Sequence, residues 1–198
     1  MAFTYFFRDA FSIDLAIKKL LEEKFVADSI RIWDAGCANG PETFTIALLL
    51  SEAMENAFNK VEIFATDIDE NNKFGTQILS GIYPKTDLLR IPKNIFEKYF
   101  LQIDDNNFKI NAHILNSIKF QKHDLLSLKE PYKKINFIVC KNVLLHFTYK
   151  ERIEVIKMYH RSLLTNGLLL MEHTQKMPEE LSHLFTKLFA NAQVFQKK

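Results

Sequence analysis

Three acidic residues follow a hydrophobic run in the segment FATDIDE, at Asp67, Asp69 and Glu70. If that run is a parallel strand, a carboxylate at its end is well placed to accept hydrogen bonds from ribose hydroxyls. Asp67 and Asp69 are two positions apart, so their side chains would point to the same face of a strand, and the pattern does not choose between them. The alternative role of these acids is to cap the next helix from a solvated turn.

A glycine-containing segment, DAGCANGPE, follows an earlier hydrophobic run and offers another part of a ligand site. Gly36 and Gly40 would let the backbone approach a ligand closely and would open the next helix. The spacing Asp-x-Gly-x-x-x-Gly differs from the Gly-x-Gly-x-x-Gly pattern of dinucleotide-binding proteins. A dinucleotide-dependent oxidoreductase is therefore a weak alternative.

Two later hydrophobic runs also end in polar residues, Asp124 in FQKHDLLSL and His146 in CKNVLLHF. The six histidines lack metal-ligand spacing, and no nucleophile with an adjacent base emerges, so no metal site is predicted. Methyl transfer to a carboxylate needs neither a metal ion nor a general base, because a free Glu has a pKa of about 4.3 and is already ionised. Such a reaction mainly requires positioning of the two reacting groups.

Hydrophobic periodicity predicts that helices and strands alternate along the chain. The first helix would bury Ile13, Ile17, Leu20 and Leu21 on one face, and Gly81 would cap the third. This alternation indicates an α/β fold with a mostly parallel sheet covered by helices on both faces. The predicted helices are 12–25, 42–56, 70–81 and 150–164, and the predicted strands are 30–33, 61–66, 135–140 and 168–173, with a turn at 165–167.

One segment, 83–120, interrupts the alternation. It contains a short helical pattern at 93–100 and an Asp-Asp-Asn-Asn cluster at 104–107 that is typical of a hairpin turn. We expect a small antiparallel β-subdomain inserted into one domain that spans residues 1–198.

The composition supports one domain, because 198 residues with 47% hydrophobic residues can bury a sizeable core. The net charge of +2 gives no strong case for nucleic acid or an anionic membrane as partner. Cys37 and Cys140 are expected to be reduced thiols. The N-terminus has no pattern of a secretory signal, and no apolar run is long enough for membrane insertion, so a cytoplasmic location is expected.

Six segments taken together make the chain similar to a known family. TYFFRD, RIWDAGCANGPETFTIA, IFATDID, SGIYP, FIVCKNVLLHF and LLTNGLLLMEHT resemble the CheR family, from Thr4 nearly to the end. These are glutamate O-methyltransferases that use S-adenosylmethionine to modify methyl-accepting chemotaxis receptors. The resemblance implies a Rossmann-like class I methyltransferase fold with a small β-subdomain. It also implies the cytoplasmic domain of a chemoreceptor as partner and S-adenosylhomocysteine as product.

The resemblance implies a role for individual residues. Asp67 matches the ribose-binding acid, which leaves Asp69 and Glu70 to start the next helix. Arg8 would lie beside the methionine part and the methyl group, where its guanidinium could orient a substrate carboxylate. Asp124 and Leu125 match a pair near the adenine. The implied catalytic residues are Arg8 and His146, and the implied cofactor-binding residues are Thr4, Arg8, Gly36, Cys37, Gly40, Glu42, Asp67, Asp124, Leu125, Cys140 and Lys141.

The sequence also departs from the family pattern. Lys141 stands where Arg is usual, His146 where Tyr is usual and Asp124 where Asn is usual. The helical domain that usually precedes the Thr4 segment is expected to be absent, and the insertion hairpin lacks glycines at its turn, so tethering to a receptor peptide is not predicted. Two alternatives stay open: a methyltransferase of the same fold with a small carboxylic acid as acceptor, and a cofactor-binding but inactive adaptor in chemotaxis signalling.

Overall fold

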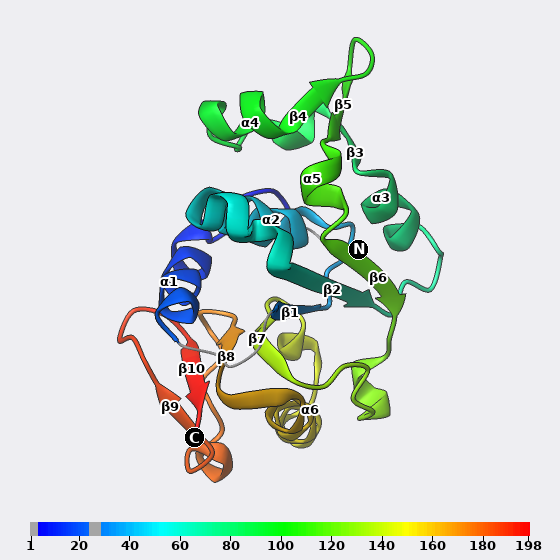
Figure 1. Cartoon of the computed structure of the whole chain (residues 1–198). Coiled ribbons are helices and arrows are strands. Elements are labelled where there is room, and N and C mark those ends of the chain that lie inside the picture. Colours follow the sequence, from blue (N-terminus) through cyan, green and yellow to red (C-terminus); the bar gives the residue numbers. More distant parts are fainter. Residues whose placement is uncertain (1–3, 24–28) are drawn as a thin grey trace.

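A seven-stranded sheet forms the centre of the computed structural model, which describes residues 4–23 and 29–198 (Figure 1). Its strands are β1 (Ile30–Ala35), β2 (Val61–Asp67), β6 (Ile118–Lys122), β7 (Ile135–Cys140), β8 (Leu163–Met171), β9 (Phe185–Lys187) and β10 (Val194–Lys197). They lie in the order β6-β2-β1-β7-β8-β10-β9. The first five in this order pair in parallel, whereas β10 runs antiparallel to β8 and β9. The predicted mostly parallel sheet is confirmed.

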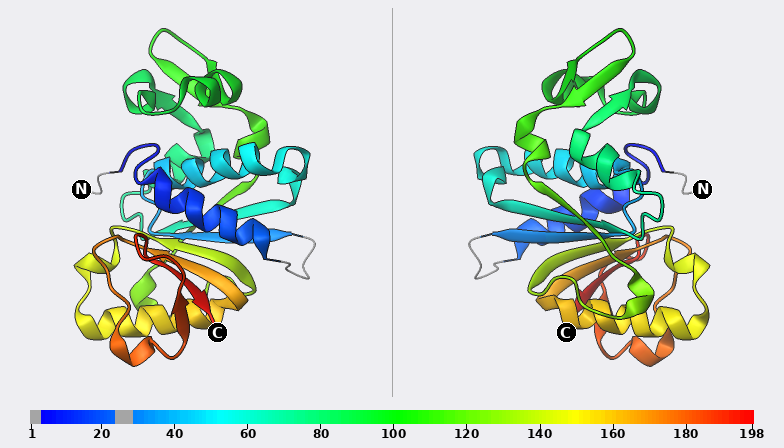
Figure 2. Two further views of the ribbon diagram at one scale, coloured as in Figure 1. Left: turned by 90° about the vertical axis from the view of Figure 1, so that its left-hand side faces the viewer. Right: turned by 90° about the vertical axis from the view of Figure 1, so that its right-hand side faces the viewer.

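Helices cover both faces of this sheet, as the side views in Figure 2 show. One face carries α1 (Ala10–Glu22), α2 (Pro41–Met54) and α3 (Phe74–Ser80), and the other carries α6 (Tyr149–Ser162). The shorter helices are α4 (Lys93–Tyr99) and α5 (Ala112–Leu115), with 3-10 turns η1 (Glu55–Lys60), η2 (Lys85–Leu88), η3 (Leu125–Ser127), η4 (Leu144–His146) and η5 (Glu179–Leu181).

The two faces of the sheet have separate hydrophobic cores because successive strand residues point in opposite directions. Ile32 packs with the core beneath α1 and α2, and its neighbour Trp33 packs with the core beneath α6. The indole Nε1 of Trp33 donates to Thr66 Oγ1 at 2.8 Å, so the largest buried ring also has its polar atom satisfied. β7 is buried along its whole length, as expected for a central parallel strand.

A second, three-stranded sheet forms the predicted antiparallel insertion. Its strands are β3 (Ile82–Pro84), β4 (Phe100–Gln102) and β5 (Asn107–Ile110), in the order β3-β5-β4. The hairpin turn between β4 and β5 forms at the predicted acidic cluster, where Asp104 Oδ1 accepts hydrogen bonds from the amides of Asn106 and Asn107 at 2.9 and 2.8 Å. The chain re-enters the main sheet at Ile118.

Phe6 connects the N-terminal segment to this insertion. Its side chain is fully buried, and its ring centroid lies 5.0 Å from Tyr83, 6.1 Å from Phe100 and 6.3 Å from Phe44. These three rings belong to β3, β4 and α2. The segment before α1 is therefore anchored in the core, and the residues that follow Phe6 are fixed in space.

Two local predictions differ from the structure. Leu21 is 37% exposed rather than buried, because it lies at the edge of the apolar face of α1. Residues 165–167 form a bulge within β8 rather than a turn, since Ile135 pairs with Leu163 but Phe137 pairs with Leu168. The predicted end of the first helix at Phe25 lies outside the described residues. β9 and β10 were not predicted.

Candidate functional site

A pocket of about 430 Å³ opens at the carboxyl ends of the parallel strands. The chain runs outward from β1 through β2 to β6 and then returns to β7 on the other side of β1. The loops after β1 and β7 therefore leave in different directions, which creates a crevice where ligands of α/β proteins bind. The volume lies within the range of small-molecule sites. The lining residues are Thr4, Arg8, Gly36, Cys37, Ala38, Glu42, Asp67, Lys141, Asn142, Val143, Leu145 and His146.

The loop after β1 forms the floor of the pocket. The amides of Gly36 and Cys37 both donate to Thr66 O, at 2.8 and 3.0 Å, which holds the loop against the end of β2. Gly36 has φ +91°, and a Cβ atom there would lie 2.2 Å from Val143 Cγ2. A side chain at position 36 would therefore force apart the loops after β1 and β7.

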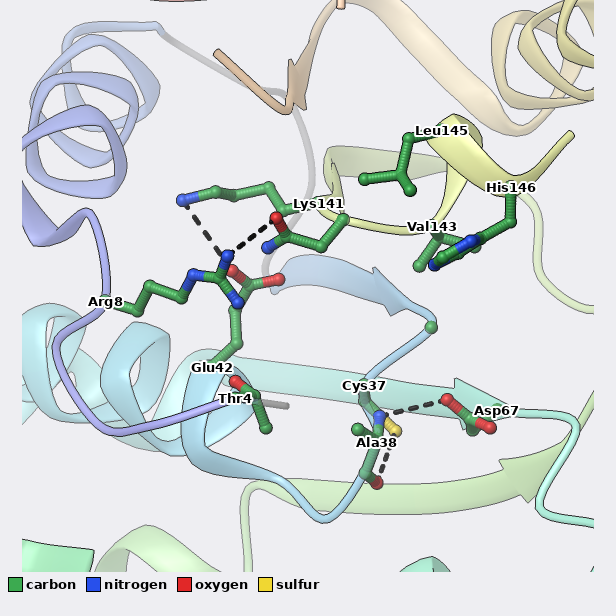
Figure 3. Close-up of a pocket in the computed structure, with 12 residues that line it drawn as sticks. Thr4, Arg8, Cys37, Ala38, Glu42, Asp67, Lys141, Val143, Leu145 and His146 are labelled. Carbon is green, nitrogen blue, oxygen red and sulfur yellow. Dashed lines mark hydrogen bonds and ion pairs between the residues drawn. The ribbon is translucent and has the colours of Figure 1, made fainter. Parts of the chain in front are cut away.

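Asp67 lies at the end of β2 and faces the same loop (Figure 3). Its Oδ2 accepts from the Ala38 amide at 3.0 Å, and its Oδ1 accepts from the Asp69 amide at 3.1 Å. A carboxylate has about four acceptor positions, so Asp67 can still accept hydrogen bonds from ligand hydroxyls.

Asp69, by contrast, belongs to the start of α3. Its carboxylate accepts hydrogen bonds from the amides of Lys73, Phe74 and Gly75 at 2.9 to 3.1 Å. The two acids that the strand pattern left equivalent therefore have different surroundings: Asp67 lines the pocket and Asp69 holds a helix N-terminus.

Opposite Asp67, a group of charged residues closes the other end of the pocket (Figure 3). Lys141 Nζ lies 2.7 Å from Asp9 Oδ2 and 3.8 Å from Glu42 Oε2, and the lysine side chain is only 1% exposed. Arg8 reaches in from the segment before α1 and donates to Asn142 Oδ1 at 2.9 Å. A ligand carboxylate at this end would meet two cations.

Two buried carboxyl groups lie close to this group. Asp34 is fully buried in β1, accepts from Thr43 Oγ1 at 2.5 Å and leaves its Oδ1 without a hydrogen-bond partner. Burial raises the pKa of Asp34 and of Glu42 above the ordinary range of carboxyl groups, and Lys141 opposes this shift in both. The Asp34–Glu42 pair therefore retains protons at pH values where exposed carboxyl groups have lost them.

The mouth of the pocket is formed by Leu145 and His146 of η4, which follow β7. Leu145 is 46% exposed, and His146 is also exposed. In Figure 3, His146 lies apart from Arg8, so the two enter the pocket from different elements. This end of the pocket is therefore exposed to solvent.

The structure brings most of the predicted site residues together. Thr4, Arg8, Gly36, Cys37, Glu42, Asp67, Lys141 and His146 all line the pocket. Four others are not among the lining residues: Gly40 has φ +100° and precedes α2, Cys140 is buried in the core on the α6 side, Asp124 accepts from the Leu126 amide at 2.8 Å, and Leu125 is buried in that same core.

Four lining residues were missed. Ala38 donates through its backbone, and Val143 and Leu145 contribute apolar surface, so none of them has a side-chain signal in the sequence. Asn142 directly follows Lys141 after a predicted strand, and the rule that ligands lie at strand ends would have found it. Among residues 4–23 and 29–198, no group of three or more His, Cys, Asp or Glu could hold a metal ion. No helix in those residues is long and apolar enough to cross a membrane.

Comparison with known proteins gives a match over almost the whole chain. Residues 2–194 match the family described as CheR methyltransferase, SAM binding domain. A chemotaxis protein methyltransferase of Borreliella burgdorferi is 35% identical over 181 residues, which cover 87% of this chain and 63% of that protein. Chemotaxis protein methyltransferase 2 of Vibrio cholerae is 26% identical, over 98% of this chain and 69% of its own length. The chain thus spans less than two thirds of the Borreliella protein.

Solved structures support the fold. PKMT2 from Rickettsia typhi aligns with a TM-score of 0.51 and 15% identity, over 86% of this chain and 26% of its own. At this identity the similarity concerns the architecture of the sheet and its helices.

Proposed function

The chain belongs to the CheR methyltransferase family, whose matched part is its SAM-binding domain, and we propose that it methylates glutamate side chains of a chemoreceptor. S-adenosylmethionine is the cofactor of this family. The proposed acceptor lies in the cytoplasmic domain of the receptor, so the proposed location of the enzyme is the cytoplasm. The products would be a glutamate methyl ester and S-adenosylhomocysteine.

The pocket fits the cofactor by the chemistry of its two ends. Asp67 can accept further hydrogen bonds from ribose hydroxyls, because its hydrogen bonds with the Ala38 and Asp69 amides use only part of its acceptor positions. The opposite end combines Arg8 and Lys141 with Glu42, a pattern that suits the carboxylate and ammonium groups of an amino acid. Gly36 keeps the floor between them free of side-chain bulk. We propose that Thr4, Cys37 and these residues hold the cofactor.

Asp124 and Leu125 are proposed to lie at the adenine end. They follow β6, which pairs with β2, and the His123 amide donates to Asp67 O at 2.9 Å. The two residues thus lie at the same edge of the sheet as Asp67. Gly40 and Cys140 are proposed to act indirectly, by opening α2 and by ending β7 beside Lys141.

The cofactor supplies an electrophilic methyl group, and the protein supplies position and charge. A glutamate acceptor is ionised at neutral pH, since its pKa is about 4.3, and needs no general base. Arg8 is proposed to hold that carboxylate, because its guanidinium lines the pocket and is itself fixed by Asn142 at 2.9 Å. His146 is proposed to donate a second hydrogen bond from the mouth.

The observation that carries the proposal is the convergence of Arg8, Asp67 and His146, from three separate elements, on one open pocket. The open mouth supports a protein acceptor over a small carboxylic acid, since Leu145 and His146 are exposed rather than covered. The volume of the pocket also counts against a blocked, inactive adaptor.

The test has two stages. The first is titration calorimetry of the protein with S-adenosylhomocysteine near neutral pH, where a Kd in the micromolar range, or about −8 kcal/mol, is expected. The second is transfer of a radiolabelled methyl group to a receptor cytoplasmic fragment, with free glutamate and other small carboxylic acids in parallel.

Variants assign the roles in the second stage. Arg8→Ala and His146→Phe should each lower kcat for the receptor fragment by about tenfold or more, as expected for loss of one charge-assisted hydrogen bond. Arg161→Ala is the matched control, because Arg161 pairs with Glu130 at 2.5 Å on the surface and does not line the pocket. Equal activity of Arg8→Ala and Arg161→Ala would refute the role of Arg8, and transfer to small acids alone would refute the protein acceptor.

A further inference from the structure

The backbone on both sides of Arg8 has an unfavourable conformation. Phe7 has φ +59° and Asp9 has φ +49°, both in the left-handed region. Residues other than glycine hold such conformations only at an energetic cost, and the conformations persist only where surrounding contacts fix them. Contacts on both sides of Arg8 are therefore needed to keep this turn in place.

The contacts before Arg8 come from α2 and the small sheet. The Phe7 amide donates to Thr45 Oγ1 at 2.9 Å, and the adjacent Phe6 ring is buried against Phe44 and Tyr83. This side of the turn is held by packing and by a hydrogen bond to α2.

The contacts after Arg8 are polar and come from the residues that follow β7 and from α1. Asp9 Oδ2 accepts from Lys141 Nζ at 2.7 Å, and Asp9 Oδ1 accepts from Ser12 Oγ at 3.0 Å. Arg8 itself donates to Asn142. The neighbours Arg8 and Asp9 thus pair with the neighbours Asn142 and Lys141, and the two contacts join the turn to the wall of the pocket. Figure 3 shows Arg8 reaching toward this wall beside Lys141.

Burial makes the contact of Asp9 with Lys141 important. The lysine side chain is 1% exposed, and the other nearby carboxyl group, Glu42, is farther away, at 3.8 Å. A buried ammonium group that loses its anionic partner is left uncompensated, so it shifts toward another polar group or draws in water. In either case the turn loses the contact that opposes its backbone strain.

We propose that Asp9 is a positioning residue: through its ion pair with Lys141 it holds the strained turn that points Arg8 into the pocket. Asp9 does not line the pocket, so it acts through Arg8 and not on the ligand. The inference rests on the proposed function, since it assigns Arg8 to the ligand site.

The test combines Asp9→Asn with Arg8→Ala in a double-mutant cycle, with affinity for S-adenosylhomocysteine as the first readout. Lys141 is left unchanged because it lines the pocket. Asp9→Asn should weaken binding by about tenfold in the natural background and by less than about twofold in the Arg8→Ala background, because coupled residues are not additive. Asp14→Asn is the matched control: Asp14 also pairs with a lysine, Lys18, at 2.7 Å, but both side chains are exposed on α1.

The second readout needs no ligand. Hydrogen exchange at the Phe7 amide should be about fivefold faster or more in Asp9→Asn than in the natural protein, and unchanged in Asp14→Asn, because local opening of the turn frees that amide. The proposal would be overturned if Asp9→Asn lowered the affinity equally in both backgrounds. It would also be overturned if exchange at the Phe7 amide were unchanged in Asp9→Asn, or if this exchange became faster while the affinity stayed the same. If the natural protein binds no S-adenosylhomocysteine, the proposed function fails, and the exchange measurement alone decides whether Asp9 holds the turn.

Discussion

The backbone amide of Ala38 donates to Asp67 Oδ2 at 3.0 Å and joins the loop after β1 to the end of β2. This contact gives the carboxylate a fixed orientation toward the pocket, whereas Asp69, two residues later, turns toward α3. The two acids should therefore respond differently to the same substitution.

Asp67→Asn should weaken binding of S-adenosylhomocysteine by roughly 10- to 100-fold, because hydrogen bonds to a charged group contribute about 1.5–3 kcal/mol. Its effect on thermal unfolding should be smaller than its effect on binding. Asp69→Asn should lower the free energy of unfolding by about 1 kcal/mol through the loss of a helix cap and leave the affinity near that of the natural protein. Calorimetric titration and urea unfolding of both variants check this, and the reverse pattern would exchange the two roles.

The buried carboxyl groups should make the protein less stable as the pH rises. Burial raises the pKa of Asp34 to about 7 and that of Glu42 to about 8. Folded protein therefore binds more protons than unfolded protein above the ordinary carboxyl range of about pH 4, so this contribution is present at low pH and is lost as the pH rises through the raised values.

Urea unfolding measured at several pH values should show the free energy of unfolding falling by more than about 1 kcal/mol between about pH 5 and pH 8.5, since one pKa unit corresponds to about 1.4 kcal/mol. Glu42→Gln should flatten this slope, because it removes the titrating group and keeps its shape. A steeper slope in Glu42→Gln than in the natural protein would contradict the assignment.

Gly36 should tolerate no side chain while Val143 is present. Gly36→Ala adds the cost of a positive φ, about 1–2 kcal/mol, to overpacking against Val143, about 1–3 kcal/mol. Chemical unfolding should show that Gly36→Ala lowers the free energy of unfolding by about the sum of these two costs. Adding Val143→Ala should restore only the part that comes from overpacking. No recovery in the double variant would mean that the backbone conformation alone limits this position.

Both thiols should be unreactive in the folded protein. Cys37 and Cys140 are only 2% and 1% exposed, and burial raises the pKa of each thiol above its ordinary value. Reaction with a thiol reagent at about pH 8 should be slower by roughly 100-fold or more than in denaturant, since the thiolate is the reactive form. Fast modification of Cys37 in native protein would show that the floor of the pocket opens to solvent.

The sequence was enough to predict the central sheet and part of the pocket, because periodicity indicates the strands, and Gly36, Asp67 and His146 lie in segments that follow predicted strands. A continuous hydrophobic run such as 135–140 is typical of a strand in the middle of a parallel sheet, where both faces are covered. Since parallel strands end at one edge, residues after β1, β2 and β7 had to meet there. Thr4, Arg8, Cys37, Glu42 and Lys141 were reached only through the resemblance, because neither periodicity nor their residue type marks them as ligand-binding residues.

What the sequence could not predict has local physical causes. β9 and β10 are three and four residues long, too short for a periodic pattern. Residues 165–167 were predicted as a turn because Asn and Gly are typical turn residues, and Asn166 does adopt a positive φ, +63°, within the bulge of β8. The Asp9–Lys141 contact joins residues 132 positions apart, and no local sequence pattern indicates a contact over such a separation.

The position of Phe6 has a consequence for how sequences with this fold can change over evolutionary time. The Phe6 ring contacts the rings of Phe44 in α2, Tyr83 in β3 and Phe100 in β4. All four side chains are buried. A change of volume at Phe6 leaves a void or a clash at the other three, and a change at any of those three leaves one at Phe6. Substitutions in this quartet should therefore accumulate together, with a larger residue at one position matched by a smaller one at its neighbour.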